Sequence, residues 1–272
     1  MKVYGKQILL VTISLALVLG LFLMGYKTPY KNVTAKNSQT TKNTFDALAY
    51  IDAQTKNLSV TDKAEIEKLT AESENKESLL LLANRWDSLK NSYAAAYYTY
   101  KLAQLENNEI TWFAAGSKFY NVANFATDSL MMANAINQAK EAYGKVVELN
   151  PKNLQAKNAL AVCIIQADDD IMKGVGMLKD VLAVDSNNVQ AIFTLGMLSI
   201  QSNQFDKAQE RFEKLIKIEP FNAEYYFYLA EVYAKSGDTQ KAIKTYETCK
   251  TLINDKEAKK EIESIINKLN KL

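Results

Sequence analysis

Histidine is absent from this chain of 272 residues, which removes the commonest general base and the commonest side-chain ligand of transition metals. No Ser–His or Cys–His nucleophile can therefore form within the chain. Its two cysteines, Cys163 and Cys249, lack the spacing of a metal site and fall at apolar positions of predicted helices. We expect buried free thiols, no metal, no cofactor and no enzyme activity. The alternative, an enzyme, would need a site of carboxylates and lysines alone.

Turn-forming residues and arginine are also scarce. With 9 Gly and 3 Pro, the chain has too few turn residues for an all-β protein, so the composition predicts an all-α fold. Arg85 and Arg211 are the only arginines, and the chain after residue 26 carries equal numbers of basic and acidic residues. A nucleic-acid binder needs a basic surface that neutralises phosphates, so nucleic acid is not an expected partner.

One long apolar run lies at the N-terminus. Residues 8–25 carry no charge, and as a helix they would span about 27 Å, enough for the hydrocarbon core of a membrane. Lys2 and Lys6 precede the run, and no clear small-x-small cleavage site comes after it. We predict a short basic tail at 1–7, an uncleaved transmembrane signal anchor at 8–26 and a polar tether at 27–43.

The orientation of this anchor rests on two opposing signals. Its layout, a short basic tail before an apolar stretch, is that of a signal anchor that exports the domain on its C-terminal side. Four lysines between residues 27 and 42 oppose this orientation, because positive charge tends to stay on the cytoplasmic side. We predict a single-pass protein of the inner (cytoplasmic) membrane whose C-terminal domain is periplasmic or extracytoplasmic. The inward-facing orientation stays open.

A 34-residue period runs through the C-terminal part of the sequence. Similar residues recur after 34 positions as the pairs Leu195 and Leu229, Gly196 and Ala230, Ala208 and Ala242, and Phe212 and Tyr246. A fixed period of this length is typical of a solenoid, in which stacked helix pairs bury faces that one pair could not bury alone. Small residues let the two helices of a pair approach closely, and aromatic residues fill the gap toward the next pair.

Motif residues in these units resemble the tetratricopeptide repeat. Trp112 and Gly116 match the start of its pattern, W-x2-L-G-x2-Y, and Ala139, Tyr143 and Pro151 match its second half. The resemblance implies a right-handed superhelical solenoid of about five helix-turn-helix units, spanning 75–256. The predicted units cover 75–108, 109–154, 155–188, 189–222 and 223–256, between N-terminal helices at 44–74 and a capping helix at 257–272. The residues predicted to pack the repeats are Trp112, Gly116, Ala139, Tyr143, Gly196, Ala208, Phe212, Ala230, Ala242 and Tyr246.

The second unit departs from the pattern. Between Phe119 and Ala139 it holds about eleven residues more than the family spacing, among them Met131 and Met132. Lengthened helices are the favoured interpretation. The alternative is a projecting segment that contacts a partner through its methionines, because methionine adapts to varied surfaces.

The resemblance also implies a peptide groove, because in this family the first helix of each unit lines the concave surface. The groove positions carried over to this chain are Phe113, Tyr120, Phe193, Met197, Ile200, Phe227 and Glu231. The family's clamp for a C-terminal carboxylate needs Lys, Asn and Arg at such positions, so we reject that clamp here. A mainly apolar groove suits an apolar peptide or an amphipathic helix. Alternatively, these side chains pack against one another, or residues 44–73 cover them.

These observations predict a membrane-anchored scaffold for protein–protein interaction in a bacterial envelope, with an assembly or chaperone-like role. Two alternatives remain, namely an inward-facing assembly platform or import-receptor-like adaptor, and an enzyme or metal-binding protein. The one acidic cluster, Asp168–Asp170, falls between two predicted helices. Aspartates at such a position cap the following helix, which we favour over a cation site. The partner protein and the oligomeric state are not predicted.

Overall fold

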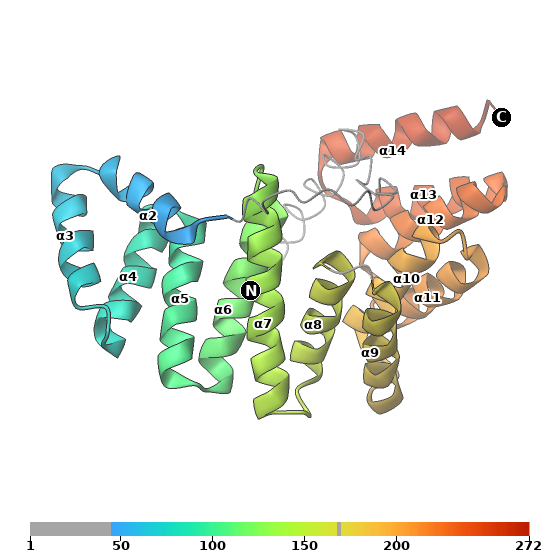
Figure 1. Ribbon diagram of the computed structural model, residues 1–272. Helices are drawn as coiled ribbons and strands as arrows, with labels where there is room; N and C mark the ends of the chain where they lie inside the picture. Colours follow the sequence, from blue (N-terminus) through green and yellow to red (C-terminus); the bar gives the residue numbers. More distant parts are fainter. Residues whose placement is uncertain (1–44, 168–169, 272) are drawn as a thin grey trace, which may run out of the picture. The chain divides into compact units, whose positions relative to one another are not determined.

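All regular structure in the described residues is helical (Figure 1). The computed structural model describes residues 45–167 and 170–271, and within them no strand occurs. The predicted all-α class is confirmed. The predicted anchor at 8–26 and tether at 27–43 lie outside the described residues. Among the helices that are described, none is both long enough and apolar enough to cross a bilayer.

The described residues form two compact units, which we call the N-terminal unit (45–186) and the C-terminal unit (187–271). The N-terminal unit comprises α2 (Ala47–Lys56), α3 (Val60–Ala71), α4 (Lys76–Ser88), α5 (Ser92–Glu106), α6 (Glu109–Phe125), α7 (Ser129–Leu149), α8 (Leu154–Ala167) and α9 (Ile171–Val184). The C-terminal unit comprises α10 (Val189–Gln201), α11 (Phe205–Ile218), α12 (Ala223–Ser236), α13 (Thr239–Leu252) and α14 (Lys256–Leu269). Within each unit, helices that are adjacent in sequence pack side by side.

Asparagine and aspartate side chains start most of these helices. Asp128 accepts a hydrogen bond from the backbone N–H of Met131 at 2.7 Å, and Asn188 accepts one from Ala191 at 3.1 Å. Such caps satisfy backbone donors that have no partner inside the helix. Asp170 caps α9 in the same way, which agrees with the capping interpretation of the acidic cluster, whose residues 168 and 169 lie outside the described part.

Close contacts between small and aromatic residues hold each helix pair together. A Cβ atom on Gly116 of α6 would lie 2.8 Å from the ring of Tyr143 on α7, and one on Gly196 of α10 would lie 3.1 Å from the ring of Phe212 on α11. In α12 and α13, Ala230 and Tyr246 are the buried counterparts. The structure buries every predicted packing residue, namely Trp112, Gly116, Ala139, Tyr143, Gly196, Ala208, Phe212, Ala230, Ala242 and Tyr246.

The additional residues of the second predicted unit lie in lengthened helices. Helices α6 and α7 have 17 and 21 residues, whereas α10 and α11 have 13 and 14. The favoured interpretation of the departure is therefore confirmed. In Figure 1 the N-terminal end of α7 extends beyond the neighbouring ends of α5 and α8. We call the joined ends of these two helices, residues 121–132, the α6/α7 tip.

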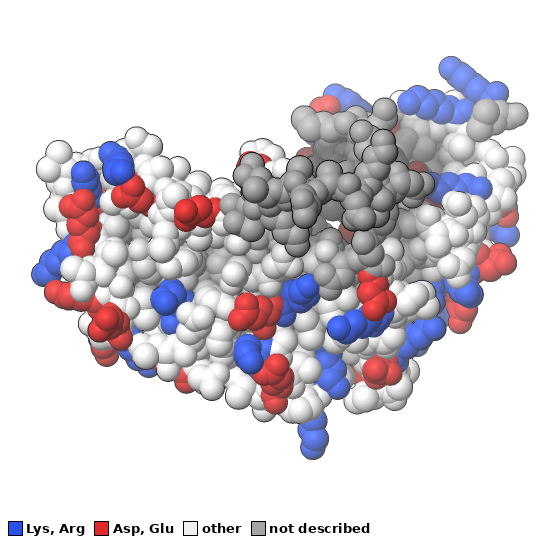
Figure 2. Space-filling model, viewed as in Figure 1, with Lys and Arg blue, Asp and Glu red and all other residues white. Residues whose placement is uncertain are grey.

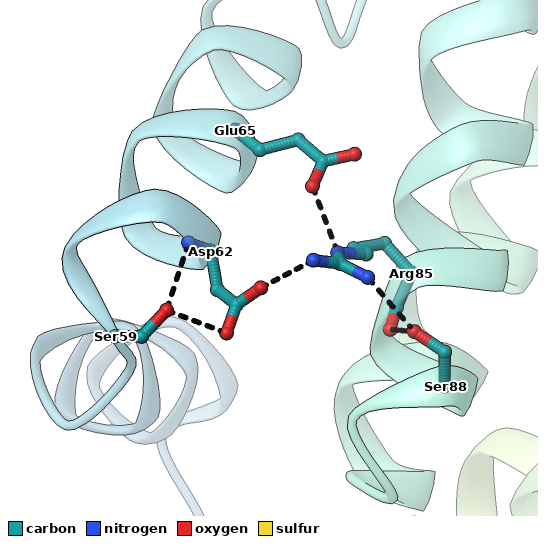
Figure 3. A network of polar contacts seen from close by, with 5 residues as sticks. All are labelled: Ser59, Asp62, Glu65, Arg85 and Ser88. Carbon is teal, nitrogen blue, oxygen red and sulfur yellow. Dashed lines mark hydrogen bonds and ion pairs between the residues drawn. The ribbon is translucent and has the colours of Figure 1, made fainter.

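Polar contacts join α3 to α4 at the start of the N-terminal unit (Figure 3). Arg85 of α4 forms ion pairs with Asp62 and Glu65 of α3, the latter at 2.9 Å between Nε and Oε2. The Ser59 hydroxyl caps α3 by accepting from the backbone N–H of Asp62 at 3.1 Å. Ile66 supplies the one fully buried side chain of α3, so these polar contacts form a large part of its attachment.

Candidate peptide-binding surface

The predicted groove residues are divided between the two units. Phe113 and Tyr120 lie on α6 of the N-terminal unit. The others lie in the C-terminal unit, where α10 carries Phe193, Met197 and Ile200, and α12 carries Phe227 and Glu231. The two sets are therefore two surfaces, each built from its own helices.

In the C-terminal unit, aromatic rings connect α10, α11 and α12. The Phe193 ring lies 6.1 Å from that of Phe212 and 5.6 Å from that of Tyr228, and the Phe212 and Tyr228 rings stack at 5.5 Å. Phe193, Met197 and Ile200 are half-buried and lie along one stripe of α10. This stripe is thus an apolar surface with solvent access that packs on an aromatic core.

Phe227 does not belong to this surface. Its side chain is 5% exposed, and its ring lies 5.6 Å from that of the buried Tyr246. The reason is the rotation of α12, which turns the stripe of Ala223, Phe227 and Ala230 into the core. The placement of Phe227 in the groove therefore needs correction, and the half-buried Tyr228 takes that place.

Sequence reasoning missed Tyr228 because the period gives no signal there. The residue 34 positions earlier is Thr194, which is neither aromatic nor apolar. The aromatic contact between α10 and α12 therefore crosses between two different repeat positions, and only the packing of the helices shows it.

Two carboxylates on α12 accompany the aromatic residues. Glu231 accepts a hydrogen bond from the Tyr246 hydroxyl at 2.5 Å, so it serves a buried tyrosine as well as the surface. Glu224 is half-buried in the first turn of α12, and burial raises the pKa of its carboxyl group. Within the described part of the chain, no ion pair includes Glu224. A partner that brings a cation or a hydrogen-bond donor would relieve this desolvation.

In the N-terminal unit, the predicted groove residues pack partly against their neighbours. The Phe113 ring lies 5.4 Å from that of Tyr143, whose hydroxyl donates to the Ser117 hydroxyl at 3.1 Å. Burial raises the pKa of Tyr143 to about 12 and also raises that of Tyr120. Phe113 and Tyr120 are both half-buried, so the expected alternative of mutual packing describes this surface in part.

The cysteines supply no reactive group. Cys163 and Cys249 are free and buried, and burial raises the pKa of each thiol to about 12. The Cys249 thiol donates to the carbonyl oxygen of Ala223 at 3.2 Å. Because the thiolate is the nucleophile, neither residue is reactive at neutral pH. Where the structure describes the chain, it holds no group of three metal-ligating side chains.

Charged side chains of both signs are interspersed over the helices in the view of Figure 2. Pairs of opposite charge within one helix include Lys145 with Glu148 and Lys260 with Glu257. Exposed pairs of this kind contribute little to stability, and they leave no single-signed field on this face that would attract a polyanion.

Comparison with known proteins identifies a known repeat in part of the C-terminal unit. A family model for the tetratricopeptide repeat matches residues 193–249, which run from α10 into α13 of the C-terminal unit. This stretch of the chain is similar to the tetratricopeptide repeat. The repeat ladder of Gly196, Ala208 and Phe212 with Ala230, Ala242 and Tyr246 lies within this matched stretch.

Solved tetratricopeptide-repeat proteins share the fold. MamA is 19% identical with a TM-score of 0.51, over 65% of this chain and 91% of that one. PilW, a type IV pilus biogenesis factor, is 16% identical with a TM-score of 0.54, over 79% of this chain and 94% of that one. TTC0263 of Thermus thermophilus is 16% identical with a TM-score of 0.52, over 73% of this chain and 100% of that one.

A curated relative matches part of this repeat protein. FK506-binding protein 59 of Drosophila melanogaster is 25% identical over 145 residues, which are 52% of this chain and 33% of that protein. The chain thus spans about a third of the length of this relative, and the likeness is confined to that part.

Proposed function

We propose that this tetratricopeptide-repeat protein is a membrane-anchored adaptor that binds a protein partner on the α10/α12 surface. We define this surface by Phe193, Met197, Ile200, Tyr228 and Glu224. The observation that carries the proposal is the half-buried apolar stripe on α10, which continues through the Phe193–Tyr228 ring contact to α12. Apolar side chains that keep solvent access above a packed aromatic core suit an interaction surface.

The chemistry of the surface favours a particular kind of partner. An amphipathic helix or apolar peptide could place its apolar side chains on Phe193, Met197 and Ile200. The half-buried carboxylate of Glu224 then favours a lysine or arginine at the end of that segment, since an opposite charge would stabilise its ionised form.

The proposed location rests on the sequence. The uncharged run at residues 8–25 supports a single transmembrane anchor, with the repeat domain on the outer side of the cytoplasmic membrane. A neighbour in fold, PilW, is a type IV pilus biogenesis factor, and we extend a role in envelope assembly to this chain as part of the proposal.

Site-specific crosslinking tests the α10/α12 surface. A photoreactive amino acid at Met197 in whole cells should capture a discrete protein, and Met197→Glu should reduce its co-purification at least about tenfold, because a charge would be buried in the interface. Phe221→Glu is the matched control, because Phe221 is an apolar residue of the same unit that is 83% exposed and lies off the stripe. Equal loss in both variants, or capture unchanged by Met197→Glu, would contradict the proposal.

Protease added to intact spheroplasts tests the orientation. The outward arrangement predicts digestion of residues 44–272, while the cytoplasmic proteins stay intact. Full protection of these residues would instead support the inward-facing assembly platform.

A further inference from the structure

A cavity of about 390 Å³ lies within the N-terminal unit, away from all the predicted groove residues. Its walls come from three places, namely α2, the turn from α4 to α5, and the α6/α7 tip. The apolar and aromatic lining includes Tyr50, Leu58, Trp86, Leu89, Phe125 and Met131. We call this space the edge cavity, because it lies where the helices of the repeats turn.

Exposed apolar side chains lie on the α6/α7 tip, and among them Phe125 lines the edge cavity. Phe125 is 61% exposed, Leu130 41% and Met132 38%. These residues belong to the stretch by which the second unit exceeds the repeat pattern. The solenoid packs without such a stretch in α10 to α13, so the longer helices supply surface that the core of the repeats does not need.

The edge cavity has one charged lining residue, Lys90, in the turn between α4 and α5. No carboxylate of the described residues forms an ion pair with it. Asp87, three positions earlier, is paired with Lys118 instead. The positive end of α5 begins beside Lys90, so both charges favour an anionic group at this rim.

Lys90 takes a left-handed backbone conformation just after α4. Its φ is +61°, in the left-handed region. The other non-glycine residues with positive φ in the described part are Asn107 and Asn203, and asparagine tolerates this conformation well. Glycine would fill the same turn without strain. The same left-handed conformation and backbone hydrogen bonds end α10 at Asn203 and α12 at Gly237, so the turn itself does not require a lysine.

Trp86 belongs to the lining of the edge cavity, although its side chain is almost wholly buried. Trp86 is 1% exposed, and its indole N–H has no hydrogen-bond partner among the described residues. The other tryptophan, Trp112, donates its indole N–H to the Asn107 side chain at 2.9 Å. The indole N–H of Trp86 is closed to solvent, so it serves as a spectroscopic probe beside the cavity and not as a binding group.

We propose that the edge cavity binds a segment of a protein partner in which a bulky apolar side chain stands next to a carboxylate. The side chain enters the apolar space and contacts the α6/α7 tip, while the carboxylate meets Lys90. The volume is within the range of small ligand sites, and the lining combines apolar and aromatic side chains with the polar ones of Gln54, Asn91 and Asn121. This site goes beyond the α10/α12 surface and uses none of its residues.

Nuclear magnetic resonance of the two tryptophan indoles tests the proposal directly. The full chain in detergent, labelled with ¹⁵N-tryptophan, should give two indole signals, which Trp112→Phe assigns. The probes are three N-acetylated peptides, namely acetyl-Ala-Phe-Glu-Ala-amide, its Gln analogue, and acetyl-Ala-Phe with a free terminal carboxylate. Both acidic probes should shift the Trp86 signal and leave that of Trp112 in place. We expect them to bind about fivefold more tightly than the Gln analogue. A difference in affinity between the two acidic probes shows whether the site prefers an internal acidic residue or a C-terminal carboxylate.

Two variants separate binding from folding. Lys90→Gly should keep or raise the melting temperature, because glycine relieves the strained turn, and should abolish the preference for the acidic probes. Ala126→Phe should fill the cavity and prevent the Trp86 shift. Its matched control is Ala133→Phe, on the exposed face of α7, which should leave the shift unchanged.

The proposal fails if no probe moves the Trp86 signal at millimolar concentration, or if Lys90→Gly leaves the acidic preference intact. It also fails if Ala133→Phe abolishes binding as fully as Ala126→Phe. None of these results bears on crosslinking from Met197. The two sites can therefore fail separately.

Discussion

The two units of the chain differ in how closely they follow the repeat. In the C-terminal unit, helices α10 to α13 each have 13 or 14 residues, and the family model matches within them. The N-terminal unit has the longer helices α6 and α7, and it carries the α2–α3 hairpin ahead of its repeats. The edge cavity lies where these two additions meet. In a solenoid, residues that keep the period form the core, and residues that break it are free to form a site.

The largest expected effect comes from the two aromatic residues that pack on Gly116 and Gly196. Phe212→Ala in the C-terminal unit should lower the free energy of unfolding by about 3–5 kcal/mol, because the residue is fully buried. Tyr143→Ala is its counterpart in the N-terminal unit and is expected to cost a similar amount. Urea denaturation measures both. A much smaller loss for Tyr143→Ala would show that the added turns of α6 and α7 compensate for the lost ring.

Two glycines of α9 offer a smaller and more selective test within the N-terminal unit. A Cβ on Gly174 would lie 2.8 Å from the backbone carbonyl oxygen of Ala161. Apart from its chain neighbours and the nearby backbone of its own helix, no atom would lie within 4 Å of a Cβ on Gly176. Gly174→Ala should therefore destabilise the protein by about 1–3 kcal/mol through overpacking. Gly176→Ala should stabilise it by about 0.5–1 kcal/mol, because alanine is the better helix former. Thermal unfolding of the pair checks the sign, and equal effects would contradict the close α8–α9 contact.

Helices α14 and α3 are held by different forces, which ionic strength can separate. Helix α14 buries Ala258, Ile262 and Ile266, whereas α3 buries Ile66 and uses the ion pairs of Arg85. Arg85→Gln should cost about 0.5–1 kcal/mol, since these groups are partly exposed, and 1 M salt should mask most of it. Hydrogen exchange should show the lost protection in α3, and unchanged protection there would argue against a role for the pairs.

The smallest expected effects come from two carboxylates whose contributions to stability depend on pH in opposite directions. Burial raises the pKa of Glu224 in the C-terminal unit, so its contribution to stability is present below the ordinary carboxyl pKa and is lost as pH rises through the folded pKa. Glu224→Gln should therefore raise the melting temperature at pH 7 and not at about pH 4.

Glu106 in the N-terminal unit behaves in the opposite way. A hydrogen bond and the charge of Lys76 lower its pKa, so its contribution is present above the ordinary pKa and is lost as pH falls through the folded value. Glu106→Gln should slightly lower the melting temperature at pH 7 and have no effect in acid. The same sign for both variants at pH 7 would contradict this assignment.

The sequence predicted the helix pairs well because their boundaries are encoded locally. Asn and Asp caps mark the starts, and the spacing of small and aromatic residues marks the contacts, as with Gly196 and Phe212. These signals depend on residues close in sequence, so the helices could be inferred one by one. The favoured interpretation of lengthened α6 and α7 came from counting residues against the same pattern.

The candidate sites were less predictable because they depend on rotation and on packing between distant segments. Phe227 and Tyr228 are adjacent, and a modest rotation of α12 decides which one the core takes. The edge cavity requires α2 to lie near the turn after α4 and near the α6/α7 tip. No periodic pattern relates residues 50, 90 and 125. The unusual backbone of Lys90 likewise leaves no trace in the residue types around it.

Each unit contains one buried thiol that can report its local opening. Cys163 lies in the N-terminal unit and Cys249 in the C-terminal unit, and the chain has no other cysteine. A thiol reagent can modify each one only when its surroundings open, so the rate of modification measures local opening. Mass spectrometry of the two modified peptides would time the opening of each unit separately, with no cysteine added to the chain. Partner binding at either proposed site would then be visible as slower modification of one cysteine alone.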